Sequence, residues 1–190
     1  MKVGVLSLQG AVEEHLNMIK RCGSEGIKVK TVKDLDKIER LIIPGGESTT
    51  IGKLAKIYGL DKAIIRQGRG GMPIFGTCAG MILLAKEIQD NEQIRFNLID
   101  IVVERNAFGR QVDSFEANLK IEDFIEKTFR AVFIRAPYIK EVGREVKILA
   151  QFNGKIVMAR QKNILVSSFH PELTNDLRVH KYFLSKNFLV

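Results

Sequence analysis

Short apolar runs alternate with amphipathic segments along the first half of the chain. The run Lys2–Leu8 is apolar without strict alternation, which is typical of a strand buried on both faces. Ala11–Cys22 carries apolar residues at helical spacing, and Gly23 follows as a stop signal. The order predicts a parallel α/β sheet with helices on both faces. The further elements expected here are strands at Ile27–Val32, Arg40–Ile43 and Met72–Phe75, and helices at Ile51–Gly68 (broken near Gly59) and Met81–Ile88.

The second half changes character, because predicted strands follow one another with no helix between them. Phe152-Asn153-Gly154-Lys155 predicts a hairpin with Asn-Gly as its turn, and Lys162-Asn163 is interpreted as the next turn. A helix over Asp176–Leu189 is expected to close the chain. We therefore expect a mostly antiparallel extension joined to the parallel core, within a single domain at residues 1–190. The predicted strands are Ile99–Glu104, Phe115–Ile121, Ala131–Arg135, Val146–Phe152, Lys155–Arg160 and Ile164–Phe169.

The composition excludes several classes of protein. Hydrophobic residues make up 45% of the chain and charged residues 27%, which is typical of a globular protein with a sizeable core. The apolar runs are strand-sized and fall far short of the roughly 20 residues that a membrane helix needs. The N-terminus shows no signal peptide, and the two cysteines form no disulfide framework, which suits a reducing compartment. We therefore expect a cytoplasmic protein with no membrane segment.

The net charge of +8 raises the question of a nucleic-acid partner. The lysines and arginines are spread along the chain, and there is no basic block with interleaved aromatic residues. We therefore expect no nucleic-acid partner. No Cys-x-x-Cys pair or His/Cys spacing indicates a zinc site, so neither a metal nor another cofactor is expected.

The first candidate for chemistry is Gly76-Thr77-Cys78-Ala79-Gly80, which lies between a predicted strand and a predicted helix. This is the spacing of a nucleophile elbow with sulfur in place of oxygen, a tight turn flanked by small residues. A helix N-terminus beside Cys78 favours the thiolate, and the N–H of Ala79 can serve an oxyanion hole. The alternative is a buried cysteine in an ordinary strand-to-helix turn, and the pattern alone leaves both open.

The second candidate is His170-Pro171-Glu172, directly after a predicted strand. In an extended chain residues two apart point the same way, so His170 and Glu172 are expected to share one side. A histidine oriented by a carboxylate is the general base that a thiol nucleophile needs. The alternative is a loop histidine beside a solvated glutamate. The other histidines, His15 and His180, fall inside predicted helices and are interpreted as surface or packing residues.

The third candidate is the glycine-rich segment Pro44-Gly45-Gly46-Glu47-Ser48 after the strand Arg40–Ile43. Two glycines let the backbone approach a ligand closely. A plain turn into a helix capped by Ser48 or Thr49 is the simpler alternative. A phosphate-binding loop does not match, because the spacing to the next glycine and the residue after Lys53 are both wrong. No dinucleotide-binding fingerprint follows the first strand.

Together these segments predict an acyl-transfer site at one edge of the sheet. Gly-Thr-Cys-Ala-Gly with Phe-His-Pro-Glu resembles the class I, triad-type glutamine amidotransferases, whose sheet is flavodoxin-like with three layers. Longer blocks resemble one branch of that family, the glutaminase subunit of pyridoxal 5′-phosphate synthase. These blocks are Leu8-Gln9-Gly10-Ala11, Pro44–Thr50, Glu104–Gln111, Phe133–Pro137 and Ser168–Leu173.

The resemblance implies a Cys78, His170 and Glu172 triad that hydrolyses L-glutamine to L-glutamate and ammonia. It implies that the ammonia passes to a synthase (lyase) subunit in a hetero-oligomeric complex. Backbone N–H groups of Gly46 and Ala79 would hold the oxyanion, and Gln9 would help to couple the site to the partner. The positions that match glutamine-binding residues are Gly46, Glu47, Ser48, Arg105, Ile134 and Arg135.

Two other functions remain open at this point. The chain could serve a different synthase with the same chemistry, although the block that begins at Glu104 argues against this. It could also be a non-enzymatic α/β binding module in which Cys78 only packs. In that case Cys78 would be alkylated at the rate of an ordinary thiol.

Overall fold

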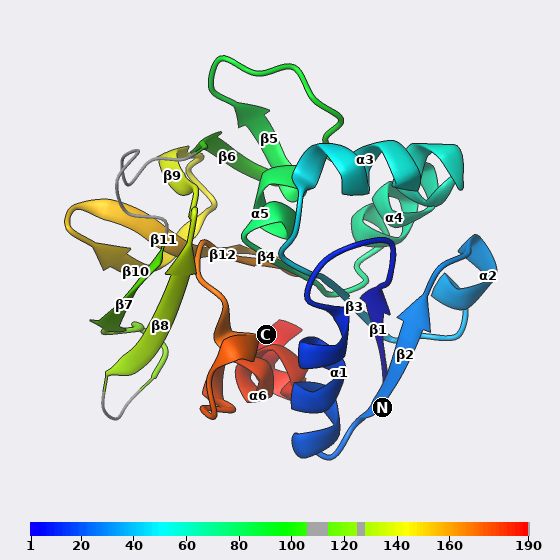
Figure 1. Ribbon diagram of the computed structural model, residues 1–190, viewed down its shortest axis with the longest axis horizontal. Coiled ribbons are helices and arrows are strands. Elements are labelled where there is room, and N and C mark those ends of the chain that lie inside the picture. The colour runs from blue at the N-terminus through cyan, green and yellow to red at the C-terminus, as the bar shows by residue number, and fades with distance from the viewer. Residues whose placement is uncertain (106–113, 125–127, 190) are drawn as a thin grey trace.

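A parallel sheet forms the centre of the computed structural model, which describes residues 1–105, 114–124 and 128–189 (Figure 1). Five parallel strands lie in the order β2-β1-β3-β4-β12, so the first and last parts of the chain share one sheet. This is the doubly wound order of flavodoxin-like folds, in which ligands bind at the carboxyl ends of the strands. The strands are β1 (Lys2–Leu6), β2 (Glu25–Val29), β3 (Arg40–Ile43), β4 (Ile74–Thr77) and β12 (Ile164–Ser167).

The central strands are apolar on both faces, and this explains why helices cover both. Leu41 and Ile43 of β3 face one hydrophobic cluster, and Ile42 between them faces the other. Helices α3, α4 and α5 cover the first face, and α1 and α6 cover the second (Figure 1). The expected three-layer α/β arrangement is therefore confirmed. The helices are α1 (Val12–Arg21), α3 (Ser48–Ile57), α4 (Leu60–Arg69), α5 (Ala79–Leu84) and α6 (Arg178–Leu184).

The antiparallel extension is also confirmed. Strand β11 pairs antiparallel with β12, and the sheet continues through β9, β6 and β5, while β10 pairs with β11. Strands β7 and β8 form a separate antiparallel pair. The Asn-Gly hairpin is present, since Phe152 pairs with Lys155 across it. The strands are β5 (Ala85–Ile88), β6 (Ile99–Glu104), β7 (Ser114–Leu119), β8 (Phe129–Ile134), β9 (Tyr138–Val142), β10 (Lys147–Phe152) and β11 (Lys155–Gln161).

Several expected elements differ in the structure. The helix predicted at Met81–Ile88 ends at Leu84, and the rest forms β5 against β6 because tertiary pairing overrides local helical pattern. The short helix α2 (Val32–Leu35) was missed, although Thr31 and Asp34 form a capping box at its start. Strand β9 was also missed.

Other boundaries are refined. Two helices, α3 and α4, cover the segment that was expected to hold one or two helices, and the left-handed Gly59 separates them as expected. The closing helix is α6 followed by a 3-10 turn at Lys186–Leu189. Within the part of the chain that the structure describes, no helix is long and apolar enough to cross a membrane.

Candidate active site

Cys78 sits in a sharp turn between β4 and α5. Its backbone angles are φ 48° and ψ −99°, outside the regions that non-glycine residues prefer, and such strain costs on the order of 1–3 kcal/mol. The N–H of Cys78 donates to the carbonyl of Ser167 at 2.8 Å, which ties the turn to β12. A Cβ on Gly80 would collide with the carbonyl oxygen of Ile43, so the small residue expected there is required. The geometry is that of the predicted nucleophile elbow.

His170 and Glu172 lie beside the elbow as a hydrogen-bonded pair. His170 Nδ1 is 2.7 Å from Glu172 Oε1, and both side chains are buried. The expected reason was wrong: β12 ends at Ser167, and Glu172 lies in a 3-10 turn at Pro171–Leu173 rather than in an extended segment. The turn brings the carboxylate back onto the imidazole, so the pairing arises from the turn.

The charges of this pair follow from its surroundings. Burial alone would lower the pKa of His170, but hydrogen bonds with Cys78 and Glu172 outweigh burial and raise it. Burial alone would raise the pKa of Glu172, but the proximity of His15 and the hydrogen bond with His170 lower it overall. An ionised Glu172 beside a readily protonated His170 is the arrangement of a general base oriented by a carboxylate.

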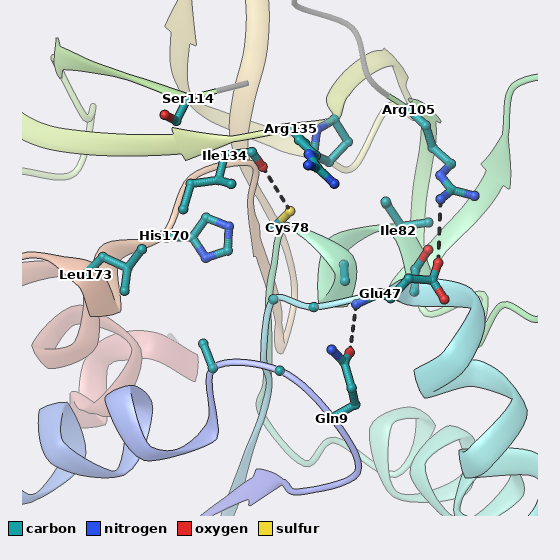
Figure 2. A pocket seen from close by; sticks show the side chains of 17 residues that line it. Gln9, Glu47, Cys78, Ile82, Arg105, Ser114, Ile134, Arg135, His170 and Leu173 are labelled. Carbon is teal, nitrogen blue, oxygen red and sulfur yellow. Dashed lines mark hydrogen bonds and ion pairs between the residues drawn. The ribbon is translucent and has the colours of Figure 1, made fainter. Parts of the chain in front are cut away.

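The loop after β3 packs against the imidazole of His170. A Cβ on Gly45 would collide with the His170 ring, so only glycine allows this approach. The carbonyl of Gly45 accepts from the N–H of Ala11 at 3.0 Å, and Gln9 Oε1 accepts from the N–H of Glu47 at 2.7 Å (Figure 2). Gln9 therefore holds the peptide that contains Gly46.

The next side of the pocket is built on the start of α3. Glu47 is the N-cap of this helix, and its carboxylate accepts from the N–H groups of Thr49 and Thr50. The simpler alternative, with Ser48 or Thr49 as the cap, is therefore wrong. Burial would raise the pKa of Glu47, and the hydrogen bonds from Thr50 and Thr49 lower it overall.

Gln93 connects this helix to β6. Its Oε1 lies 3.0 Å from Arg105 Nη1 and 3.2 Å from the hydroxyls of both Ser48 and Thr49. Arg105 Nη2 also approaches Glu47 Oε1 at 3.8 Å, so the guanidinium is held at the pocket wall. Sequence reasoning missed Gln93, because it lies in an irregular segment with no motif of its own.

Strand β8 supplies the opposite wall. The carbonyl of Ile134 lies 4.0 Å from Cys78 Sγ, and Arg135 follows with a left-handed φ of 43°. Figure 2 shows Arg135 and Arg105 on the same side of the thiol, with His170 on the other. Two cationic side chains in the same pocket suit a ligand that carries a carboxylate.

A single pocket of about 730 Å³ gathers most of the residues singled out from the sequence (Figure 2). Glu172 does not line it, because it lies behind His170. The part of the resemblance block at residues 106–111 lies outside the described residues. Among the described residues, no cluster of His, Cys, Asp and Glu side chains is arranged to hold a metal ion. The predicted residues that line the pocket are Gln9, Gly46, Glu47, Ser48, Cys78, Ala79, Arg105, Ile134, Arg135 and His170.

The interpretation of His15 and His180 needs correction. They are packing residues as expected, but they are buried at 0% exposure and in contact with the site rather than away from it. His15 Nε2 lies 3.5 Å from Glu172 Oε2. Helical periodicity in the sequence could not predict these contacts, because the tertiary fold alone brings His15 of α1 beside His180 of α6 and Glu172.

The doubly wound sheet, with the strained Cys78 turn at the carboxyl end of β4, is the architecture of a glutamine amidotransferase. The chain belongs to the SNO glutamine amidotransferase family, which matches residues 5–189. It is 59% identical to a protein of Pelotomaculum thermopropionicum named "Pyridoxal 5'-phosphate synthase subunit PdxT", over 98% of this chain and 95% of that one. A protein of the same name from Clostridium beijerinckii is 55% identical over 100% of both chains.

Solved structures agree with this assignment. A crystal structure of a glutamine amidotransferase superposes with a TM-score of 0.92 at 49% identity and covers 96% of each chain. PurLQS from Thermotoga maritima gives a TM-score of 0.70 at 17% identity, over 100% of this chain and 98% of that one. The second likeness shows the shared fold alone.

Proposed function

We propose that this chain hydrolyses L-glutamine to L-glutamate and ammonia through Cys78, His170 and Glu172, and delivers the ammonia to a synthase subunit that makes pyridoxal 5′-phosphate. The observation that carries the chemistry is the strained Cys78 elbow beside a buried His170–Glu172 pair. The family membership supports the substrate, and the name of the relatives supports the client.

In the first half-reaction, the thiolate of Cys78 attacks the carboxamide carbon of glutamine and forms a C–S bond. Protonated His170 gives its proton to the amide nitrogen, so the C–N bond breaks and ammonia leaves. Water then attacks the thioester while His170 accepts a proton. The C–S bond breaks, and glutamate leaves with the thiolate restored.

Backbone N–H groups of Gly46 and Ala79 hold the developing oxyanion in this proposal. Ala79 is supported by its place at the start of α5, and Gly46 by the close packing of its loop on His170. Arg105 or Arg135 receives the α-carboxylate of glutamine, and Glu47 and Ser48 complete the site with the wall at Ile134. The pocket lining supports each of these assignments.

Gln9 couples the site to the synthase subunit in this proposal. Its hydrogen bond with the N–H of Glu47 links the segment after β1 to the oxyanion loop. We expect docking of the partner to reorient the peptide at Gly45–Gly46 and to raise kcat. An oxyanion hole stabilises the transition state only when its N–H donors point at the developing oxyanion. Equal kcat with and without the partner would contradict this coupling.

The proposal treats residues 1–190 as one cytoplasmic domain. Strands from both ends of the chain in one sheet support a single domain. Two free thiols, one of them the nucleophile, suit a reducing compartment.

The test measures glutamate formed from glutamine by the full chain mixed with a pyridoxal 5′-phosphate synthase subunit. We expect Cys78→Ala to abolish glutamate formation, because no other group supplies the nucleophile. The matched control is Cys22→Ala, which removes the second thiol, does not touch the pocket lining and should retain activity. Glutamate formation by Cys78→Ala would overturn the proposal, and activity indifferent to this partner would overturn the client alone.

A further inference from the structure

A cluster of polar side chains is buried directly behind the triad. His15 on α1, Thr77 on β4 and His180 on α6 are each at 0% exposure. His15 contacts both Thr77 and His180, and it also approaches Glu172 in its 3-10 turn. We call these four residues the buried histidine cluster. None of them except Glu172 has a place in the reaction described above. Polar groups without water are costly unless paired, so their arrangement calls for a physical reason.

The carboxylate of Glu172 is only half paired by the triad. Its Oε1 takes the hydrogen bond with His170, while its Oε2 has no hydrogen-bond partner among the described residues. A buried anionic oxygen in that state is strongly destabilised, and it favours any donor that reaches it. His15 Nε2 is 3.5 Å away, slightly longer than a formed hydrogen bond.

The hydrogen bonds around His15 decide which of its nitrogens carries the proton. His15 Nδ1 lies 3.0 Å from His180 Nε2, and His15 Nε2 lies 3.2 Å from the hydroxyl of Thr77. His180 Nδ1 is buried without a partner among the described residues. Only one of the two imidazoles can donate across the Nδ1–Nε2 contact.

One of the two proton arrangements fits Glu172 and the other does not. If His180 donates from Nε2, then His15 accepts at Nδ1 and carries its proton on Nε2, facing Glu172 and Thr77. The unpaired atom is then a ring nitrogen lone pair on His180. In the reverse arrangement His15 turns a lone pair toward the carboxylate, and His180 buries an unpaired N–H. The first arrangement removes a repulsion and avoids an orphaned donor.

Both imidazoles are neutral in this arrangement. Burial lowers the pKa of His15, partly opposed by Glu172, while His170 lowers it further and Glu14 on the same helix raises it slightly. Burial lowers the pKa of His180 to about 3, with His15 adding to the effect. Glu172 opposes that shift, and Arg21 contributes to it. A neutral imidazole still offers one N–H, which is what Glu172 Oε2 lacks.

We propose that His15 is a positioning residue of the glutaminase, which donates Nε2–H to Glu172 Oε2 in the tautomer that His180 fixes. This extends the proposed triad by two residues in the order His180, His15, Glu172, His170 and Cys78, and it rests on the proposed function. His15 touches neither substrate nor thiol. It acts by holding the Glu172 carboxylate ionised and aimed at His170 Nδ1, so that His170 can carry the proton that Cys78 releases.

The test compares His15→Leu with His15→Gln in the full-length chain. Leucine removes the donor, while the amide nitrogen of glutamine falls near the position of Nε2 and retains it. With the partner present, we expect His15→Leu to lower kcat roughly 10–100-fold with KM nearly unchanged, as for other groups that orient a ligating or catalytic side chain. His15→Gln should recover most of that loss.

A second readout needs no partner. The rate of Cys78 alkylation by iodoacetamide, followed by mass spectrometry against pH, reports how well His170 and Glu172 support the thiolate. We expect the midpoint to move to higher pH in His15→Leu and in His180→Leu. His180→Gln, which keeps a donor toward His15 Nδ1, should stay near the native midpoint.

The matched packing control is Phe183→Leu, on the same helix as His180. Phe183 packs on Phe75 with the ring centroids 5.5 Å apart and the rings tilted by 43°. Its side chain cannot form a hydrogen bond to the cluster, so its loss lowers thermal stability without changing any proton position. If the histidine variants match Phe183→Leu in kcat and alkylation midpoint, the inference fails and the histidines only pack. If Cys78→Ala still forms glutamate, the proposed function fails instead, so the two failures are distinguishable.

Discussion

Two regions of the Cys78 pocket differ in their exposure to water. We call Glu172, His15 and His180 the back of the pocket, and Glu47, Arg105 and Gln93 the front. At the back, Glu172 and the histidines around it are buried, and Glu172 Oε2 and His180 Nδ1 have no hydrogen-bond partner in the part of the chain that the structure describes. At the front, the side chains of Glu47 and Arg105 are 49% and 31% exposed and share several hydrogen bonds with helix α3 and Gln93. The back has no water to compensate for a lost interaction, whereas the front has water at hand.

The difference separates two contributions to the reaction. A change at the back alters where protons and charges lie on the triad, and these positions matter in the transition state. A change at the front alters how well glutamine is held, before and during the reaction alike. We therefore expect back variants to lower kcat and front variants to raise KM.

The largest effect is expected for Glu172→Gln. The amide keeps the shape but offers one acceptor where two ring donors, His170 Nδ1–H and His15 Nε2–H, each need one. One imidazole must then change its tautomer or lose its bond. We expect kcat to fall roughly 10²–10⁴-fold, as when a triad carboxylate becomes an amide, with KM nearly constant. Steady-state glutamate formation measures both, and a KM effect alone would contradict the role of this back residue.

A smaller effect is expected for Gln93→Leu. The substitution removes an acceptor shared by Ser48, Thr49 and Arg105, so the guanidinium and the start of α3 lose their common anchor. We expect KM for glutamine to rise about tenfold, or about 1.4 kcal/mol in binding, while kcat changes little. Lys53→Leu on the exposed side of α3 is the control and should leave both parameters unchanged. A loss of kcat without a change in KM would contradict the expectation that front residues act on the binding of glutamine.

The last prediction concerns stability rather than activity, and it depends on pH. The pKa values of His15 and His180 are lowered in the folded chain, so unfolding takes up protons once the pH falls below the usual value of about 6.5. The free energy of unfolding should then fall by up to about 1.4 kcal/mol per pH unit for each histidine. The loss begins near pH 6.5 and continues toward pH 3 for His180.

Other groups act in different windows. The pKa of His170 is raised, so its contribution is fully present below pH 6.5 and is lost only as the pH rises. The lowered pKa values of Glu172 and Asp176 matter only at more acidic pH, below about 4.5. Denaturant unfolding between pH 6.5 and 4.5 therefore isolates the two histidines. His180→Leu should reduce the slope of the free energy of unfolding against pH. An unchanged slope would show that groups other than His180 cause this pH dependence.

The sequence was sufficient for the five parallel strands and for many of the residues that line the pocket, for reasons that are local. Strands buried on both faces are continuous apolar runs, and the elbow at Cys78 needs small residues at fixed positions. Each of these sequence patterns is contained within about ten consecutive residues. The short apolar pattern after Gly80 did not reveal where α5 gives way to β5, because that boundary depends on pairing with β6.

Such local sequence patterns could not predict the contacts behind the triad. His15 and His180 are 165 positions apart and meet through the packing of α1 and α6. Their helical surroundings predicted packing and nothing more. Likewise, the His170–Glu172 pair was expected from an extended strand but is produced by a 3-10 turn. Contacts between distant polar side chains depend on the tertiary fold, which local periodicity does not determine.

The measurement that bears most directly on the central claim is covalent labelling with a glutamine analogue that carries an electrophilic diazoketone in place of the carboxamide. Peptide mapping by mass spectrometry then identifies the labelled residue. We expect a single adduct on Cys78, prevented by excess glutamine, with Cys22 unmodified. Labelling at Cys22, or glutamate formation that persists once Cys78 is fully labelled, would contradict the assignment of Cys78 as the nucleophile.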